Sequence, residues 1–395
     1  MLKEKDFLIQ VLADYLNKKV TAVPDDLDWN VLEKISLDQE LSGIIYHQCK
    51  KSIIRSDLPE EAKTNWRQGY LYNSFLYVTR LALLRKIDKE FQKENIAYVI
   101  FKGTEVASFY PVPAQRTMGD LDLLVHPEDK QRAFEALTRL GFKMKLKTSD
   151  EWITEKNEMI IELHHKLIYA HSIEWEIIQT WGNRVWDYAA DQKNIIQRKL
   201  DLTYHLVYLL LHLRKHLLEN GVAFRQFMDV AVLASQPGIN WKQAESWLKE
   251  LDLTKFSQTC FAFCERWFGV TIQTGKIKLQ EDFYNGFTEK IFAGGMFGLN
   301  DQDNKDNAIY IKMHYAKSTG SGVNAFLNHA FLPYKEMCDL PYCSFLSGRP
   351  YLLPVAWCWR LVYKVYKGNL IPFLKGAYDS DTIKKKEDMF AKWGL

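Results

Sequence analysis

Two short stretches, Tyr98–Thr104 and Gly119–Val125, most constrain what this chain can fold into. The first reads Tyr-Val-Ile-Phe-Lys-Gly-Thr, an apolar run that meets a lysine and a glycine. β-Branched and aromatic residues favour a strand, and glycine permits the sharp strand-to-helix turn that lets backbone N–H groups face a phosphate. We therefore expect a strand that turns at Lys102-Gly103 into a short helix.

The second stretch, Gly-Asp-Leu-Asp-Leu-Leu-Val, carries two carboxylates two residues apart. Side chains alternate along a strand, so Asp120 and Asp122 share one face while Leu121 and Leu123 point to the other. Neighbouring carboxylates repel each other unless cations neutralise them, and Mg²⁺ takes oxygen ligands from carboxylates and substrate phosphates together. This strand therefore predicts a divalent-metal site that handles a phosphate-bearing substrate.

The composition is that of a folded globular protein, with 47% hydrophobic and 26% charged residues in 395. The net charge of +3 gives no argument for a nucleic-acid partner, which would need a basic face. The charged N-terminus has no signal-peptide core, so we expect a cytoplasmic protein. We expect no membrane span, because Pro354 and Arg360 interrupt the most apolar late segment, Tyr351–Val362, which is shorter than the roughly 20 residues required.

Hydrophobic periodicity predicts helices before residue 95, including a long one from Pro59 to Lys93. Strands are expected at 98–101, 119–125, 142–147 and 159–164, and helices return after residue 171. The predicted fold class is α+β, with a small mixed β-sheet core flanked by an N-terminal and a larger C-terminal α-helical region. The expected regions are an N-terminal helical region at 1–95, the α/β core at 96–170, a helical domain at 171–275 and a mostly helical C-terminal region at 276–395.

The order Lys102-Gly103, Arg116, Asp120-x-Asp122 and then a carboxylate on a later strand resembles the nucleotidyltransferase superfamily of DNA polymerase beta. More narrowly, it resembles the bacterial group described as uncharacterised nucleotidyltransferases. The resemblance runs from the long predicted helix through the helices after residue 202. It implies a nucleotidyltransferase core that transfers a nucleoside monophosphate from an NTP to an acceptor hydroxyl. Pyrophosphate release and two divalent ions, Mg²⁺ or Mn²⁺, are implied with it.

The resemblance implies two groups of site residues. The catalytic and metal-binding acids are Asp120, Asp122 and Glu162, the last within Ile160-Ile-Glu-Leu-His164. The nucleotide- and phosphate-binding residues are Lys102, Gly103, Thr104 and Arg116. Two features depart from the superfamily pattern: threonine replaces the usual serine after Gly103, and an insertion with Pro111 and Pro113 lengthens the segment before Asp120.

Other interpretations of these residues stay open. Glu155 and Glu158 are alternatives to Glu162, and Arg116 could instead tie down its own proline-rich loop by pairing with a surface acid. His164 shares a strand face with Glu162 and could assist near the acceptor.

Three further accessory candidates lie on the predicted helices. His212 and His216, with His205, fall on one face of the predicted helix 202–218, and Asp229 lies on the next helix. Spacing of four could form a second metal pair, but no glutamate follows His212 as a zincin requires. A structural or nucleotide-facing role is therefore favoured for this face.

The first functional hypothesis is a metal-dependent nucleotidyltransferase whose acceptor hydroxyl belongs to a small molecule or a protein. The second is a catalytically idle relative that binds nucleotide or a protein partner as a regulator. The third is a small-molecule phosphotransferase, which ranks last because the chain has no kinase-type glycine-rich loop or catalytic-loop signature.

Overall fold

The computed structural model describes residues 2–56, 58–147, 151–168, 175–192, 195–219, 221–275, 277–295, 331–338, 340–366 and 388–395. The chain divides into two compact units. Unit 1 comprises Met1–His216 and Gly221–Leu299, and unit 2 comprises Leu217–Asn220 and Asn300–Leu395. The predicted division into four regions stays a prediction, and much of its last region lies outside the described residues.

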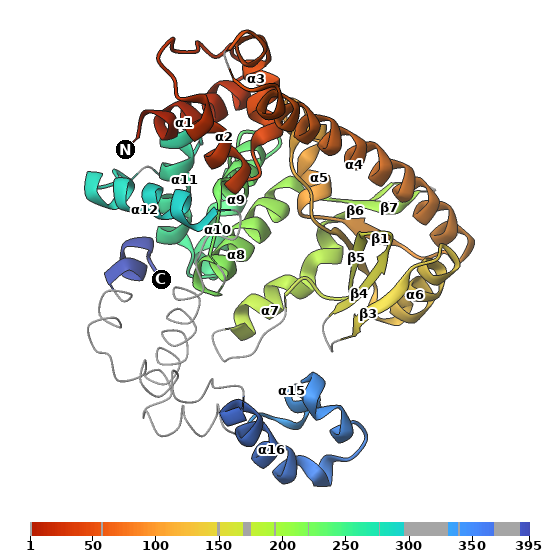
Figure 1. Ribbon diagram of the computed structural model, residues 1–395. Coiled ribbons are helices and arrows are strands. Elements are labelled where there is room, and N and C mark those ends of the chain that lie inside the picture. Colours follow the sequence, from red (N-terminus) through yellow and green to blue (C-terminus); the bar gives the residue numbers. More distant parts are fainter. Residues whose placement is uncertain are drawn as a thin grey trace. The chain divides into compact units, whose positions relative to one another are not determined.

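Unit 1 begins with four helices in the region that the periodicity predicts to be helical, although the third of them is not predicted as a separate helix (Figure 1). The Asp28 side chain caps the second of them by accepting hydrogen bonds from the N–H groups of Asn30 and Val31. Pro59 immediately precedes the long fourth helix, where it costs no internal hydrogen bond. The four helices are α1 (Lys3–Leu16), α2 (Trp29–Asp38), α3 (Ser42–Arg55) and α4 (Glu60–Lys93).

A seven-stranded mixed sheet follows, with the strand order β3-β4-β5-β2-β1-β7-β6. Strand β1 is antiparallel to β2 and parallel to β7, and β2 is parallel to β5. The remaining neighbours are antiparallel. The strands are β1 (Tyr98–Ile100), β2 (Leu121–Val125), β3 (Lys143–Lys147), β4 (Glu151–Lys156), β5 (Met159–His164), β6 (Ala189–Gln192) and β7 (Ile195–Leu200). The predicted α+β class with a mixed sheet is confirmed.

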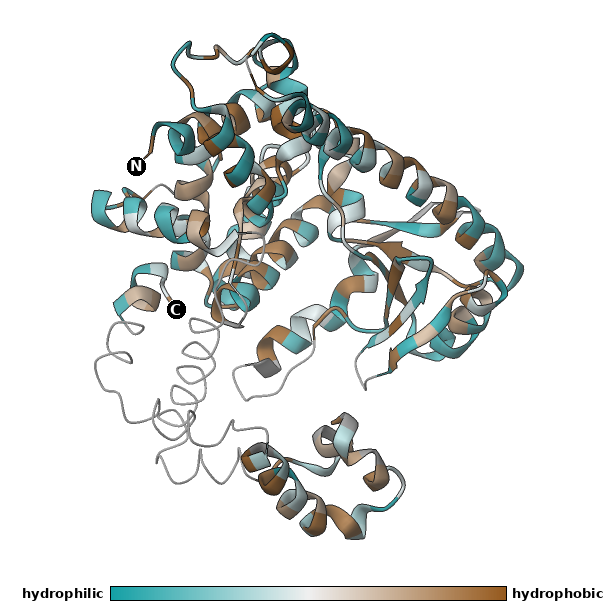
Figure 2. Ribbon diagram, in the orientation of Figure 1, coloured by the Kyte–Doolittle hydropathy of each residue, from teal (hydrophilic) through white to brown (hydrophobic). Residues whose placement is uncertain are grey.

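The two faces of the sheet differ in polarity. One face, with Leu121, Leu123, Ile161 and Leu163, forms a buried core with residues of α4 and of α6 (Lys130–Arg139). The opposite face carries the polar side chains of β2 and β5, because residues alternate along each strand. Hydrophobic residues are spread along the length of α4 (Figure 2), and its exposed ones are Leu71, Tyr72, Phe75, Val78 and Leu81.

The helices of unit 1 that follow α4 do not share one face of the sheet, because α6 packs with α4 on its apolar face. They are α5 (Gly103–Ala107), α6 (Lys130–Arg139), α7 (Trp175–Asn183), α8 (Leu202–Glu219), α9 (Phe224–Ala234), α10 (Trp241–Glu250), α11 (Thr254–Phe268) and α12 (Glu281–Gly294). Short 3₁₀ turns are η1 (Pro113–Gln115), η2 (Pro127–Asp129) and η3 (Arg184–Tyr188).

The described residues of unit 2 include the helices α15 (Tyr334–Cys338) and α16 (Leu353–Tyr366). Two 3₁₀ turns, η5 (Pro341–Leu346) and η6 (Pro350–Leu352), lie between them, and a small core forms around Met337, Cys343, Leu346 and Ala356. Across the described parts of both units, no helix is long and apolar enough to cross a membrane.

Candidate metal and phosphate site

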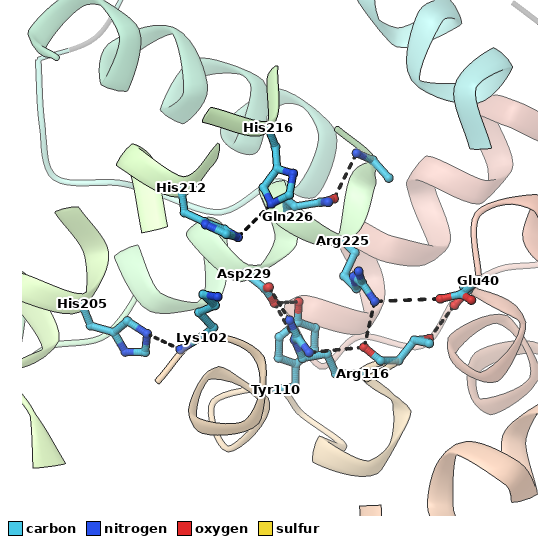
Figure 3. Close-up of polar contacts among 12 residues, drawn as sticks. Glu40, Lys102, Tyr110, Arg116, His205, His212, His216, Arg225, Gln226 and Asp229 are labelled. Carbon is cyan, nitrogen blue, oxygen red and sulfur yellow. Dashed lines mark hydrogen bonds and ion pairs between the residues drawn. The ribbon is translucent and has the colours of Figure 1, made fainter. Parts of the chain in front are cut away.

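Lys102 occupies an unusual backbone conformation between β1 and α5, with φ 54° and ψ −136°. A non-glycine residue in such a region costs of order 1–3 kcal/mol and persists only where its surroundings hold it. Its backbone N–H donates a hydrogen bond to Nε2 of His205 on α8, at 3.1 Å (Figure 3). The predicted strand-to-helix turn is therefore present, and α8 helps to hold it.

The turn brings the Lys102 side chain to the polar face of the sheet. Its Nζ lies 2.6 Å from Oδ1 of Asp122 and 3.6 Å from Oε2 of Glu162. The two acids are register partners on the parallel strands β2 and β5. Nε2 of His164 completes the group, at 3.1 Å from Oδ1 of Asp122 and 3.3 Å from Oε2 of Glu162. We call Lys102, Asp122, Glu162 and His164 the acid cluster.

Burial and neighbouring charges shift the ionisation of the acid cluster. Burial alone would raise the pKa of Asp122, but Lys102 and His164 hold it below its usual value. Burial raises the pKa of Glu162 to about 7, and the charges of Asp120 and Asp122 act in the same direction. The hydrogen bond with His164 and the charge of Lys102 only partly oppose this rise. The ionised form is therefore favoured for Asp122, whereas it is disfavoured for Glu162.

Ligand atoms of Asp122, Glu162 and His164 all lie within 4.8 Å of one another, which suits a single metal ion. Two carboxylates and an imidazole fit a divalent ion such as Mn²⁺, which accepts both oxygen and nitrogen ligands, while Mg²⁺ prefers oxygen. Lys102 Nζ contacts the same carboxylate oxygens. A metal ion would therefore compete with this ammonium, and the amine would be released toward other anions.

Asp120 stands one residue before β2 and is half-buried. Among the described residues it lies outside the group of ligand atoms formed by Asp122, Glu162 and His164. Its charge nevertheless contributes to the raised pKa of Glu162, so the two carboxylates are near each other. The metal-binding role of Asp120 stays a prediction, and His164 takes the third position in the geometry.

Arg116 forms a second buried ionic group, separate from the acid cluster (Figure 3). Its Nε and Nη2 donate to the two carboxylate oxygens of Asp229 at 2.8 and 2.6 Å, and Tyr110 donates to Oδ1 of Asp229 at 2.7 Å. We call Arg116 and Asp229, together with the Tyr110 hydroxyl that donates to Asp229, the arginine pair. Here the alternative interpretation of Arg116, pairing with an acid, describes the observed contacts, although that acid is buried. Triphosphate binding by Arg116 stays a prediction.

Gly103 is the residue that lets the arginine pair approach the Lys102 turn. A Cβ at this position would lie 2.5 Å from Nη1 and 2.8 Å from Nη2 of Arg116. A Cβ at residue 103 would therefore force the Arg116 guanidinium to shift from its contacts with Asp229. Thr104 follows, and its buried Oγ1 has no hydrogen-bond partner in the described structure. A phosphate role for Gly103 and Thr104 stays a prediction.

His212 and His216 contact each other one turn apart on α8, with their Nε2 atoms 2.9 Å apart (Figure 3). Neither of these two residues belongs to the metal-ligand group of the acid cluster. Arg225 on α9 donates to the Thr117 carbonyl at 3.3 Å, and its Nη1 lies 3.9 Å from Oε2 of Glu40. The same Thr117 carbonyl also accepts a hydrogen bond from Nη1 of Arg116, at 3.3 Å.

Sequence reasoning missed Arg80 of α4 altogether. This buried side chain donates from Nη2 to the carbonyls of Met118 and Gly119, directly before the two aspartates. Burial lowers its pKa to about 10, and the charge of Asp120 is the largest opposing influence. The available signal was an arginine placed beside Leu81, Leu83 and Leu84 in an otherwise apolar stretch.

The family described as "Uncharacterised nucleotidyltransferase" matches residues 25–269 of the chain. The matched range contains every residue of the acid cluster, the arginine pair and the histidine contact on α8. No curated protein and no solved structure matches the chain.

Proposed function

Because the chain belongs to the uncharacterised nucleotidyltransferase family, we propose that it transfers a nucleoside monophosphate from an NTP to a hydroxyl group. The acceptor is a small molecule or a protein, and pyrophosphate is the second product. The observation that carries this proposal is the register pairing of Asp122 with Glu162, which sets two carboxylates and His164 around one point.

Asp122, Glu162 and His164 of the acid cluster would hold divalent ions, with Asp120 as the further candidate ligand. Such ions supply neutralisation of phosphate charge and a more acidic acceptor hydroxyl when they are bound. The acceptor oxygen forms a bond to the α-phosphorus, the bond from that phosphorus to pyrophosphate breaks, and the hydroxyl proton leaves to water. Lys102 would stabilise the negative charge that develops on the phosphate oxygens in the transition state. Its Nζ already lies next to the carboxylate oxygens of Asp122 and Glu162 that would hold the ions.

One observation favours a second candidate, a catalytically idle nucleotide-binding regulator. Lys102 Nζ already neutralises Asp122 at 2.6 Å, so an ammonium could satisfy the site permanently in place of a metal ion. The two candidates differ in metal affinity. An enzyme must exchange this contact for a divalent ion, whereas an idle relative retains it.

The test is NTP turnover with Mg²⁺ or Mn²⁺ over a panel of acceptors, followed by pyrophosphate release, together with Mn²⁺ binding measured by electron paramagnetic resonance. Asp122→Asn and Glu162→Gln should each lower turnover by about 1000-fold, since metal-assisted charge stabilisation is worth several kcal/mol. Both variants should also weaken Mn²⁺ binding. Asp120→Asn tests whether the third acid joins them.

Glu128→Gln is the matched control, because Glu128 is an exposed acid just beyond β2. Its turnover and Mn²⁺ binding should equal those of the native protein. Pyrophosphate release that survives both Asp122→Asn and Glu162→Gln would refute the assignment of the site. Nucleotide binding without Mn²⁺ binding or turnover would favour the regulator.

A further inference from the structure

The contact between His212 and His216 is built into α8 by their spacing of four residues. Their Nε2 atoms lie 2.9 Å apart and their ring centroids 4.4 Å apart. Both residues are half-buried, so neither is sealed inside the core. The facing nitrogens can bind either a cation, through their lone pairs, or an anion, through N–H groups.

Distance alone does not decide between the two ligands. An ion that binds both nitrogens at about 2.05 Å and at a right angle would hold them about 2.9 Å apart. A hydrogen bond between two imidazoles has the same length. The surrounding charges must therefore distinguish a metal site from an anion site.

The charges that face the pair are mainly positive. Burial lowers the pKa of His212, and Lys102 and His216 lower it further. Burial lowers the pKa of His216 to about 4, with Lys215, Lys102 and Arg225 acting in the same direction. The opposing influence comes from Asp122 on His212 and from Asp120 on His216. Lys102, Lys215 and Arg225 outnumber the opposing acids Asp120 and Asp122, so the local charge favours an anion over a metal ion.

A continuous line of rings joins the pair to the acid cluster. His164 contacts Phe101, Phe101 contacts Tyr208, and Tyr208 stacks on His212, with centroid separations of 5.2, 5.6 and 6.0 Å. Lys102 extends from its turn toward His212 in Figure 3, while its Nζ contacts Asp122. The histidine pair is thus linked to the acid cluster by ring contacts, and the charges of Lys102 and Asp122 act on His212.

We propose that His212, His216 and Arg225 bind the β- and γ-phosphates of the NTP substrate. The inference rests on the proposed nucleotidyl transfer and names the residues that hold the triphosphate. Arg225 is suited to move toward such a ligand, because its side chain is 29% exposed and its polar contacts among the described residues are long, at 3.3 and 3.9 Å. Arg116 is not suited, because two of its nitrogens are committed to Asp229.

Tripolyphosphate is the probe, titrated calorimetrically into the full chain in chelator-treated buffer. His212→Leu and His216→Leu remove the N–H groups without changing net charge, and each should weaken binding about tenfold. Arg225→Gln should have an effect of similar size. His212→Gln and His216→Gln restore an amide donor and should recover part of the affinity. In turnover, the leucine variants should raise the KM for NTP more than they lower kcat.

Two matched variants separate this site from its surroundings. His47→Leu changes an exposed histidine on α3 that stacks on Tyr70, and it should bind tripolyphosphate like the native protein. Asp122→Asn should also retain metal-free tripolyphosphate binding, although it abolishes turnover. Circular dichroism should show unchanged helix content in every variant.

Each outcome decides the inference independently of the catalytic proposal. Weaker tripolyphosphate binding in both leucine variants supports the anion site even if no acceptor gives turnover. Unchanged binding overturns it even if Asp122→Asn abolishes turnover. If the leucine variants lost binding of inorganic phosphate but kept binding of tripolyphosphate, the inference would be wrong, and the histidines would instead bind a phosphate-bearing acceptor. Loss of Zn²⁺ binding with intact tripolyphosphate binding would overturn it in favour of a metal site.

Discussion

Unit 1 contains two buried ionic groups that resemble each other in composition and differ in how well they are paired. In the arginine pair, both oxygens of Asp229 accept charged or neutral hydrogen bonds, and the fork of Arg116 matches the carboxylate. In the acid cluster, the contacts concentrate on one oxygen of Asp122 and one of Glu162.

The pKa shifts show what this difference means energetically. Burial opposes the charge of Arg116, yet Asp229 raises its pKa, so the pair is stable as ionised. Burial raises the pKa of Glu162 to about 7, so its charged form is disfavoured in the folded protein. The fully paired arginine pair stabilises the fold. In the acid cluster, an added cation would stabilise the ionised form of Glu162, which burial disfavours.

The largest effect should come from removing one partner of the arginine pair. Asp229→Asn leaves the buried Arg116 charge uncompensated and should lower the free energy of unfolding by about 3–5 kcal/mol in urea denaturation. Glu281→Gln is the control, because it breaks the exposed pair of Arg266 and Glu281 and should cost less than about 1 kcal/mol. Equal, small losses in both variants would show that the two ionic groups do not differ as inferred.

The next effect tests how the arginine pair meets the Lys102 turn. Gly103→Ala would place a Cβ 2.5 Å from Nη1 of Arg116, so the guanidinium must shift and the free energy of unfolding should fall by about 1–3 kcal/mol. Gly286→Ala in α12 is the matched control, because a Cβ there meets nothing within 4 Å. That control should gain up to about 1 kcal/mol, since alanine favours a helix. A Gly103→Ala protein as stable as native would mean that Arg116 has room to move.

Local sequence patterns predicted the acid cluster better than the arginine pair. Alternation along two strands predicts that Asp122 and Glu162 lie on polar faces. In the structure these two strands are neighbours, and the two acids are register partners. The arginine pair joins residues 113 positions apart in the chain. No local pattern indicates such a pairing, because Arg116 lies beside a proline turn and Asp229 lies among apolar residues of its helix, between Met228 and Val230.

The missed elements have similar causes. Strand β4 reads Glu-Trp-Ile-Thr-Glu-Lys and β7 reads Ile-Ile-Gln-Arg-Lys-Leu, and neither is apolar enough to stand out from a loop. Both become strands because neighbouring strands offer unpaired backbone groups. The apolar stripe of α4 predicted a helix correctly, but periodicity alone does not indicate that Phe75 and Val78 remain exposed while Ile87 and Phe91 are buried.

A third prediction concerns the histidine that holds the Lys102 turn. Burial lowers the pKa of His205 to about 4 from 6.5, so the unfolded chain takes up a proton before the folded protein does. Its contribution to stability is therefore complete above pH 6.5 and is lost as the pH falls toward 4. His205→Gln keeps an acceptor for the Lys102 N–H but does not titrate.

The stability difference between native protein and His205→Gln should narrow by about 1–2 kcal/mol over that pH range in urea denaturation. His47→Gln serves as the control. His47 is exposed and its pKa is lowered by partial burial, so this variant should show less narrowing. If the free energies of unfolding of the native protein and His205→Gln changed in parallel with pH, protonation of His205 would cost the folded protein little stability.

The smallest expected effect gives the sharpest contrast between the two ionic groups. Because the pKa of Glu162 is raised to about 7, its folded-state penalty grows as the pH rises from 4.5 through 7. Glu162→Gln removes this penalty and keeps an oxygen that can accept from His164. In EDTA at pH 8 the variant should match or exceed the native free energy of unfolding, by up to about 1 kcal/mol. Adding Mn²⁺ should reverse the order, because only the native cluster gains by binding the ion. Glu128→Gln should follow the native protein under both conditions. A Glu162→Gln protein that is clearly less stable in EDTA would make the acid cluster a structural pair like that of Arg116 and Asp229.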